Sequence, residues 1–209
     1  MTASLVHRGP DASGAWYDES AGIALGHRRL SILDLSEAGA QPMHSRCGRF
    51  VTAFNGEIYN HLELRERLAA EGMAPQWRGH SDTETLLAAI AAWGLDATLE
   101  RSSGMFAIAL WDRERRRLSL ARDRMGEKPL YWGWAGEDIV FASELKALRA
   151  HPGFRPDLDR DAVFWEAEVC VAEQLRPLGH VHAPVVPPAG VLEIAVVRTL
   201  IQPLGNAAG

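Results

Sequence analysis

The residues in this chain best suited to chemistry are Asn55, Gly56 and Glu57, which follow an apolar run at residues 50–54. The side-chain amide of Asn55 can donate a hydrogen bond, and Gly56 has no side chain to keep a ligand away from its backbone N–H. The carboxylate of Glu57 can accept from an ammonium group. Together they suit a site that binds a small zwitterionic amide and stabilises an oxyanion beside it. The competing interpretation is a hairpin turn, because Asn-Gly after a strand often forms one.

The elements that must position these residues are short strands and a few helices. Apolar and alternating runs predict the strands, and the glycine and proline turn signals in residues 1–21 predict an entry loop. The expected strands cover residues 23–27, 30–34, 49–54, 105–111, 118–122, 130–134 and 138–142.

Two helices are expected between these blocks of strands, at residues 60–71 and 82–93, and a short helix is expected at 143–149. The sequence from Ser81 to Glu84 is a capping-box pattern at the start of the second helix, and Gly94 is its expected end. Helices grouped between blocks of antiparallel strands favour an α+β layered fold over a doubly wound parallel sheet.

The composition is that of an ordinary globular chain, with 209 residues, 47% of them hydrophobic and 23% charged. A net charge of −5 argues against a dedicated nucleic-acid binder. No apolar run is long enough to span a membrane, and the two cysteines, Cys47 and Cys170, are too few for a disulfide framework. We therefore expect a cytoplasmic protein with neither a nucleic-acid nor a membrane partner.

Three further signals favour structural roles. A cluster of arginines near residue 115 is interleaved with acids, which predicts a solvated hairpin turn. Trp132 and Trp134 alternate along one expected strand, which favours packing between layers over a ligand platform. His180 and His182 form the tightest histidine pair, but no cysteine or carboxylate nearby completes a metal site.

Several motifs follow one another along residues 5–162. They are His7-Arg8-Gly9-Pro10-Asp11, Gly26-His27-Arg28-Arg29-Leu30-Ser31-Ile32, Gln41-Pro42-Met43, Phe54-Asn55-Gly56-Glu57-Ile58-Tyr59-Asn60, Ser81-Asp82-Thr83-Glu84, Gly104-Met105-Phe106-Ala107, Ala121-Arg122-Asp123-Arg124, Lys128-Pro129-Leu130-Tyr131 and Phe141-Ala142-Ser143-Glu144-Leu145-Lys146-Ala147-Leu148. Taken together and in this order, they resemble the glutaminase domain of glutamine-hydrolysing asparagine synthetase, a class II glutamine amidotransferase. The resemblance implies a four-layer αββα sandwich of the N-terminal-nucleophile hydrolase type.

The resemblance also implies a pocket for L-glutamine. The glutamine-binding residues that it implies are Arg29, Leu30, Ser31, Ile32, Asn55, Gly56, Glu57 and Asp82. Among them, Arg29 would hold the substrate α-carboxylate through its fork of donors. Glu57 and Asp82 would neutralise the α-ammonium group. Asn55 and the Gly56 N–H would form the oxyanion hole, which is the catalytic part of the site.

Two of these assignments have a competing interpretation from the residues alone. Arg29 is then a surface residue of a strand. Asp82 is an early residue of a helix, where a negative charge is favoured in any case.

The chain departs from the family at its start. Family members begin Met-Cys-Gly-Ile, and the cysteine, N-terminal once the methionine is removed, attacks the amide of glutamine while its α-amine acts as the base. This chain begins Met1-Thr2-Ala3, so we expect the first strand and the nucleophile to be missing. Thr2 is a weak substitute because it lies at the wrong place relative to the motif at His7. Cys47 and Cys170 are interpreted as incidental thiols.

The pyrophosphate-binding Ser-Gly-Gly-x-Asp-Ser loop of the synthetase domain does not occur in the sequence either. No cofactor is therefore expected in this chain, since ATP and magnesium would belong to that synthetase domain. The expected organisation is an amidotransferase domain at residues 1–162, without its first strand, and a divergent tail or truncated linker at 163–209. A helix at 162–173 and a strand at 191–197, with no confident partner, are expected in this last part.

Three interpretations of function stay open. The first is the glutaminase half of an asparagine synthetase, which supplies ammonia for asparagine formation from aspartate and ATP. On this interpretation the sequence starts at an internal start codon, and the chain as written is inactive because it lacks the cysteine. The second is a non-catalytic module that binds glutamine, or docks on a synthetase domain or a full-length relative. The third is a decayed fragment, because loss of a strand exposes a sheet edge and opens the core. The resemblance further implies a homodimer.

Overall fold

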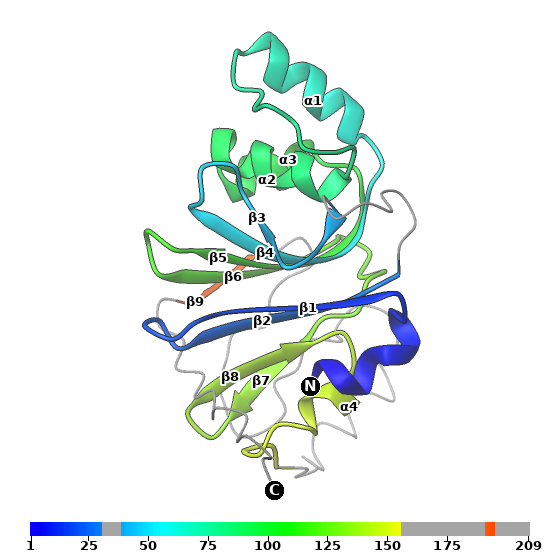
Figure 1. Ribbon diagram of the computed structural model, residues 1–209, viewed down its shortest axis with the longest axis vertical. Helices are drawn as coiled ribbons and strands as arrows, with labels where there is room; N and C mark the ends of the chain where they lie inside the picture. The colour runs from blue at the N-terminus through cyan, green and yellow to red at the C-terminus, as the bar shows by residue number, and fades with distance from the viewer. Residues whose placement is uncertain (31–38, 156–190, 195–209) are drawn as a thin grey trace, which may run out of the picture.

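The computed structural model describes residues 1–30, 39–155 and 191–194. These residues form four stacked layers, which Figure 1 shows edge-on. A layer of three helices covers a five-stranded sheet, two β-hairpins pack on the other face of that sheet, and two short helical segments close the stack. This order confirms the predicted αββα sandwich.

The five-stranded sheet is antiparallel. Its order is β3-β4-β5-β6-β9, with bounds β3 Met43–His44, β4 Phe50–Ile58, β5 Gly104–Asp112, β6 Arg117–Arg122 and β9 Val191–Ile194. The pairing of β4 with β5 places Asn55 opposite Ala107 and Gly56 opposite Phe106, well inside both strands. The hairpin-turn interpretation of Asn55-Gly56 is therefore wrong, because a partner strand far away in the sequence extends β4 through these residues.

The third layer consists of two hairpins. One pairs β1 (Ala12–Asp18) with β2 (Ile23–Arg29), and the other pairs β7 (Tyr131–Ala135) with β8 (Asp138–Ala142). The last layer holds the 3-10 helix η1 (Thr2–Arg8) and the four-residue helix α4 (Leu145–Leu148). Figure 1 shows these two segments side by side, and they are in contact.

The helix layer contains α1 (His61–Ala70), α2 (Asp82–Trp93) and α3 (Leu95–Arg101). The bounds of α2 are those that the sequence predicts. The side chain of Ser81 accepts from the backbone N–H groups of the first turn, and Gly94, with φ of 85°, ends the helix.

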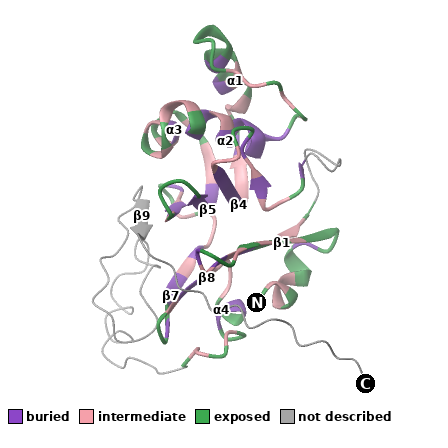
Figure 2. Cartoon of the chain, turned by 60° about the vertical axis from the view of Figure 1, so that its left-hand side comes forward, coloured by how far each residue is buried: buried purple, intermediate pink, exposed green. Residues whose placement is uncertain are grey.

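Three apolar clusters fill the three spaces between the layers. The cluster between helices and sheet contains Phe54, Ile58, Leu64, Leu86, Ile90, Phe106 and Ile108 among others. The cluster between the sheet and the hairpins contains Ile23, Leu25, Val51, Ala109, Trp111, Leu120 and Trp132. A small third cluster beneath β7 and β8 contains Ala135, Val140 and Leu148. Figure 2 shows that the buried residues concentrate in β4, β5 and α2, so these elements form the centre of the fold.

The sequence prediction of an entry loop at residues 1–21 is wrong in two places. Residues 2–8 form η1, and residues 12–18 form β1, whose Trp16 packs against the cluster between the sheets. The prediction holds for residues 9–11 between them and for residues 19–21, which form the turn after β1. Helix α3 was not predicted either, because the seven residues that follow Gly94 form only about two helical turns and show too little periodicity to be recognised.

Two smaller predictions can also be compared with the structure. The arginine-rich turn at residues 113–116 joins β5 to β6 and is exposed, as predicted. Trp132 packs between the layers as expected, but Trp134 is 37% exposed and does not.

Several expectations concern residues that the description does not cover. The predicted strand at 30–34 lies almost entirely outside it, and the helix at 162–173 lies wholly outside it. Strand β9 corresponds to the start of the strand predicted at 191–197, and its partner is β6. In the described part of the chain, every helix is too short or too polar to cross a bilayer.

Candidate functional site

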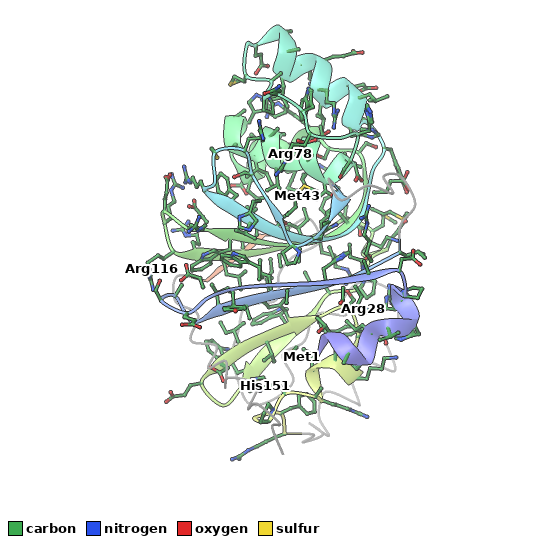
Figure 3. The ribbon with its side chains drawn as sticks, in the orientation of Figure 1. Met1, Arg28, Met43, Arg78, Arg116 and His151 are labelled. Carbon is green, nitrogen blue, oxygen red and sulfur yellow. The ribbon has the colours of Figure 1, made fainter. Side chains whose placement is uncertain are left out.

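A cavity of about 310 Å³ opens where β2 and the second half of β4 come together. Its wall comes from segments that lie far apart in the sequence. The lining residues are Leu5, Arg8, Gly26, His27, Arg28, Arg29, Leu30, Gly39, Gln41, Phe54, Asn55, Gly56, Ser81, Asp82, Thr83, Lys128 and Ser143. Figure 3 places Arg28 on the right-hand side of the molecule, near η1, and Arg116 on the left-hand side, so the cavity and the β5–β6 turn are well separated.

The alternation of β4 directs Asn55 toward this cavity. Val51 and Ala53 on the same face of the strand pack between the sheets, and Asn55 continues their row where the apolar filling stops. The Nδ2 of Asn55 donates to the Oγ of Ser143, 3.5 Å away, just after β8. A polar residue therefore ends an otherwise apolar row, and its amide lies in the space between the two sheets.

The backbone of β4 presents a row of N–H groups along the same edge. The N–H of Phe54 donates to Oε1 of Gln41 at 2.7 Å, and that of Ile58 donates to Oδ2 of Asp82 at 2.9 Å. Gly56 lies between them. Its partner Phe106 directs both its N–H and its C=O to Asp123, so the N–H of Gly56 points away from β5 toward the cavity.

Gly56 thus differs from its two neighbours in this row. Among the described residues, no acceptor meets its N–H. No side chain fits at this position, because a Cβ would overlap the carbonyl oxygen of Met105 on β5. The close approach of β5 therefore requires glycine at this position.

Asp82, the first residue of α2, is only 6% exposed. Its Oδ2 accepts from Ile58 of β4, and its Oδ1 accepts from the N–H of Thr83 at 2.8 Å. Asp82 therefore joins the start of the helix to the sheet while also lining the cavity. The two interpretations of Asp82 are therefore compatible, because the residue is an acid in the first turn of a helix and also lines the cavity.

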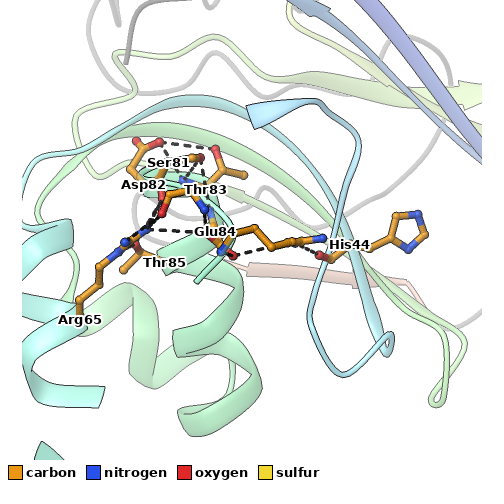
Figure 4. Close-up of polar contacts among 9 residues, drawn as sticks. His44, Arg65, Ser81, Asp82, Thr83, Glu84 and Thr85 are labelled. Atoms are coloured by element: carbon orange, nitrogen blue, oxygen red, sulfur yellow. Dashed lines mark hydrogen bonds and ion pairs between the residues drawn. The ribbon is translucent and has the colours of Figure 1, made fainter. Parts of the chain in front are cut away.

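The loop before α2 is held by a polar network that Figure 4 shows. Arg65 donates to Oγ1 of Thr85 at 2.7 Å, to the carbonyl of Gly79 at 3.1 Å and to that of Ser81 at 3.2 Å. Glu84 accepts from the N–H groups of Arg78 at 2.8 Å and Gly79 at 3.0 Å. This network fixes the position from which Asp82 enters the cavity wall. It was not predicted, because no sequence pattern shows that α1 reaches this loop.

The opposite wall is held by a cluster of charges between η1 and α4. Glu144 accepts from His7 at 2.8 Å, Arg8 at 3.2 Å and Lys146 at 3.1 Å. The hydrogen bond from His7, with help from Lys146 and Arg8, lowers the pKa of Glu144 to about 2. The carboxylate is therefore ionised throughout the neutral range, and it holds Arg8 in the cavity wall.

The end of β2, where Arg29 lies, is fixed from the same side. The Nε of Arg28 donates to the carbonyl of Gly9 at 2.9 Å, and the N–H of Asp11 donates to the carbonyl of Arg29 at 3.1 Å. The motifs around His7 and Arg28, which are separate in the sequence, are thus directly connected.

His27 is the titratable group most perturbed by burial in this wall. Burial lowers the pKa of His27 to about 4, so the ring is neutral at neutral pH. Its Nε2 donates to the carbonyl of Phe54 at 3.1 Å, which leaves Nδ1 as an acceptor. Within the described part of the chain, Nδ1 is buried and has no partner.

The structure brings together most of the residues predicted for the site. Arg29, Leu30, Asn55, Gly56 and Asp82 all line the cavity, although their individual roles stay predictions. Glu57 lies one position beyond Gly56 and is not among the lining residues, whereas Ser31 and Ile32 lie outside the described residues. Sequence reasoning did not assign a role to Arg8, Gln41, Lys128 or Ser143, and the only available signal was that each stands in one of the ordered motifs.

The alternative nucleophiles lie elsewhere. Cys47 lines a second cavity of about 400 Å³ beneath α2, together with His44. Thr2 is the first residue of η1 and is not among the residues that line the first cavity. Cys170, like His180 and His182, lies outside the described residues. Within the described residues, histidine, cysteine and acidic side chains form no group that could hold a metal ion.

Comparison with known proteins gives a consistent result. The profile of a family described as a glutamine amidotransferase domain matches residues 1–192. Asparagine synthetase [glutamine-hydrolyzing] 3 of Bacillus subtilis (strain 168) is 40% identical over 162 residues, which are 77% of this chain and 25% of that protein. Putative asparagine synthetase [glutamine-hydrolyzing] 2 of Methanocaldococcus jannaschii is 35% identical over 181 residues, with 78% of this chain and 34% of that protein covered. The chain thus spans about a quarter to a third of the length of these relatives.

Solved structures resemble the fold as well. The glutamine phosphoribosylpyrophosphate (PRPP) amidotransferase from B. subtilis, complexed with ADP and GMP, superposes with a TM-score of 0.51 and 28% sequence identity. The superposition covers 60% of this chain and 28% of that one. It supports the predicted fold class, the sandwich of the N-terminal-nucleophile type.

Proposed function

The chain belongs to the glutamine amidotransferase domain family, and from this premise we propose that the cavity binds L-glutamine. The observation that carries the proposal is the N–H of Gly56, which faces the cavity between two N–H groups that already have acceptors. With the amide of Asn55 on the same strand, it can donate to the carbonyl oxygen of a substrate amide and to the oxyanion formed from it.

The other end of glutamine is assigned by charge. Arg29 binds the α-carboxylate, and the backbone at residues 30–32 lines the same side. Asp82 accepts from the α-ammonium group, and a buried carboxylate on the cavity wall supports that role. Glu57, which is not among the lining residues, assists only if the bound ligand reaches past Gly56.

This binding proposal predicts a measurable heat of binding for L-glutamine in isothermal titration calorimetry. Arg29→Ala removes a charge-assisted pair and should weaken binding at least about tenfold. Asp82→Asn should weaken it similarly, since the amide cannot neutralise an ammonium group. Arg115→Ala, which removes a positive charge from the distant β5–β6 turn, is the control and should bind as the unmodified chain does. No heat at millimolar L-glutamine would reject the proposal.

The relatives named as glutamine-hydrolysing asparagine synthetases favour a second, catalytic function for a longer polypeptide. There, a cysteine thiolate attacks the amide carbon, the resulting oxyanion accepts from Asn55 and Gly56, ammonia leaves, and water hydrolyses the thioester. Removing one oxyanion donor typically lowers kcat about 100- to 1,000-fold. The described residues would provide the oxyanion hole, and the thiol would come from an upstream extension.

The N-terminal sequence and intact mass of the protein from its own cells test this catalytic function. A chain that begins at a cysteine upstream of Met1 supports it, and ammonia release from glutamine should then slow about 100- to 1,000-fold on Asn55→Ala. A chain that begins at Met1 or Thr2 contradicts it and leaves the binding function alone. We further propose a cytoplasmic location, a homodimer, and a synthetase domain or full-length relative as the partner that binds ATP and magnesium.

A further inference from the structure

The second cavity, of about 400 Å³, is separate from the candidate site and shares none of its described lining residues. The turn between β3 and β4, the loop between α1 and α2, and helix α2 itself form its wall. The lining residues are His44, Ser45, Arg46, Cys47, Met73, Pro75, Arg78, Glu84, Leu87, Ala88, Ala91 and Ala92. This volume lies within the range of about 300–1,000 Å³ that is usual for small-molecule sites.

The part of the wall that α2 contributes is apolar. The helix has no charged side chain after Glu84, and Ala88, Ala91 and Ala92 recur at helical spacing along the cavity. Ala91 is exposed, although a helix face that meets solvent normally carries polar side chains. Met73, from the loop, is also partly exposed and lines the same cavity. An apolar group placed there would therefore lose contact with water against two elements at once.

The charged groups of this wall leave one cation without a partner. Arg78 and Glu84 compensate each other, since Nε of Arg78 lies 3.4 Å from Oε1 of Glu84. His44 is uncharged at neutral pH, because burial and then the charges of Arg113 and Arg78 lower its pKa. Arg46 is exposed, and its guanidinium meets no acceptor among the described residues. The wall thus combines an apolar surface with a single unpaired positive charge.

We propose that the second cavity binds a small monocarboxylate with an apolar body. The body lies along Ala88 and Ala91, and the carboxylate pairs with Arg46. The planar guanidinium group can donate two parallel hydrogen bonds to a carboxylate. A single unpaired cation matches one negative charge. A cationic ligand would find no free carboxylate in its place, because Glu84 already accepts from Arg78 and from the N–H of Gly79 at 3.0 Å.

Calorimetric titration of the intact chain with octanoate and with 1-octanol tests the class of ligand, because the two probes have the same chain length and differ in charge. We expect octanoate to bind roughly tenfold more tightly, as for hydrogen bonds between charged groups. Arg46→Met should remove this advantage and leave the affinity for 1-octanol unchanged. Arg46→Lys should retain part of it, since the charge stays. Arg149→Met is the control and should change neither affinity, because Arg149 is an exposed arginine beside α4, in the layer farthest from α2.

Cys47 reports where the ligand binds. Its thiol is exposed and it lines the cavity, so bound octanoate should slow its alkylation by iodoacetamide severalfold. Mass spectrometry of the peptide that contains Cys47 measures this rate in the unmodified chain. Ala91→Glu places a negative charge and a longer side chain in the cavity. It should abolish octanoate binding while the thermal melt stays unchanged, because Ala91 is exposed.

The outcomes decide each part of the proposal. Octanoate that gives no heat of binding overturns it, and so does binding that leaves the alkylation of Cys47 unchanged. Equal affinities for octanoate and 1-octanol in the unmodified chain overturn the role of Arg46, and this comparison needs no variant. Titration of the same protein with L-glutamine tests the first cavity separately, so failure of this inference is distinct from failure of the proposed function.

Discussion

At the scale of single residues, the candidate site depends on groups whose usual partners are absent. The N–H of Gly56 lies between two N–H groups with acceptors, and the ammonium of Lys128 extends from a fixed backbone. The Nδ1 of His27 is buried without a partner in the described part of the chain. Such unpaired groups cost stability in an empty site, and they gather around one cavity. Their clustering is the physical reason to expect a ligand there.

His27 gives a prediction for the dependence of stability on pH. Its folded-state pKa of about 4 lies below the ordinary histidine pKa of 6.5, so the unfolded chain takes up the proton first as the pH falls. The free energy of unfolding should therefore decrease between about pH 6.5 and pH 4, by up to roughly 3 kcal/mol from this group. Urea denaturation measured at steps across this range should show the decrease, and His27→Gln should remove most of it. An unchanged slope in the variant would contradict the prediction. The lowered pKa of Glu144 makes its own contribution fall only as the pH drops below about 4.5, so it overlaps the acidic end of this range alone.

At the scale of elements, helix α2 is tied to the sheet at one end by the network around its first turn. Ser81 caps the helix, Asp82 binds the backbone of β4, and Glu84 binds the preceding loop. Arg65 of α1 closes the network from the other side, with its guanidinium 4.0 Å from the ring centroid of Trp77. Contacts with β4, with the preceding loop and with α1 thus fix the start of α2, in addition to its cap.

Glu84→Gln tests the strength of this network. Glu84 is only 3% exposed and lies near two arginines, so loss of its charge leaves buried donors poorly matched. We expect the free energy of unfolding to decrease by about 2–4 kcal/mol, as measured by urea denaturation. Glu66→Gln, on the exposed face of α1, is the matched control and should change it by less than about 0.5 kcal/mol. Equal effects of the two substitutions would show that the network contributes little.

The elements also differ in how far their conformation is determined by the residues next to them in the sequence. The bounds of α2 could be predicted because Ser81 and Gly94 act within a few residues of themselves. Asn55 and Gly56 gave a turn signal that was wrong, since strand β5, about fifty residues away, decides their conformation. Lys128 and Gln41 could not be assigned to a site from sequence, because only the assembled layers bring them to one cavity. The ordered motifs identified the correct residues without giving their geometry.

At the scale of the whole molecule, the central sheet couples the layers. Strands β4, β5 and β6 contribute alternate side chains to the clusters on both of their faces. Neither cluster can lose its packing without exposing a face of the same three strands. The described layers should therefore unfold together, as a single cooperative unit.

This coupling is tested by one truncation in each cluster. Leu120→Ala opens the space between the sheets, and Ile90→Ala opens the space beneath the helices. Each should destabilise the chain by about 2–5 kcal/mol. Circular dichroism and tryptophan fluorescence should still give coincident denaturation curves in both variants. Two separate transitions would contradict the coupling, and absence of any cooperative transition in the unmodified chain would instead support the interpretation as a decayed fragment.

The cavity wall runs from Leu5 near the N-terminus to Ser143 after β8. A ribosome makes this chain from its N-terminus, at about 5–20 residues per second, so roughly 7 to 28 seconds separate the first wall residue from the last. During that interval β1, β2 and β4 are present without the strands and the helix that complete the wall. A ligand cannot assist the early steps of folding on the ribosome, because its binding site is complete only after most of the chain has emerged.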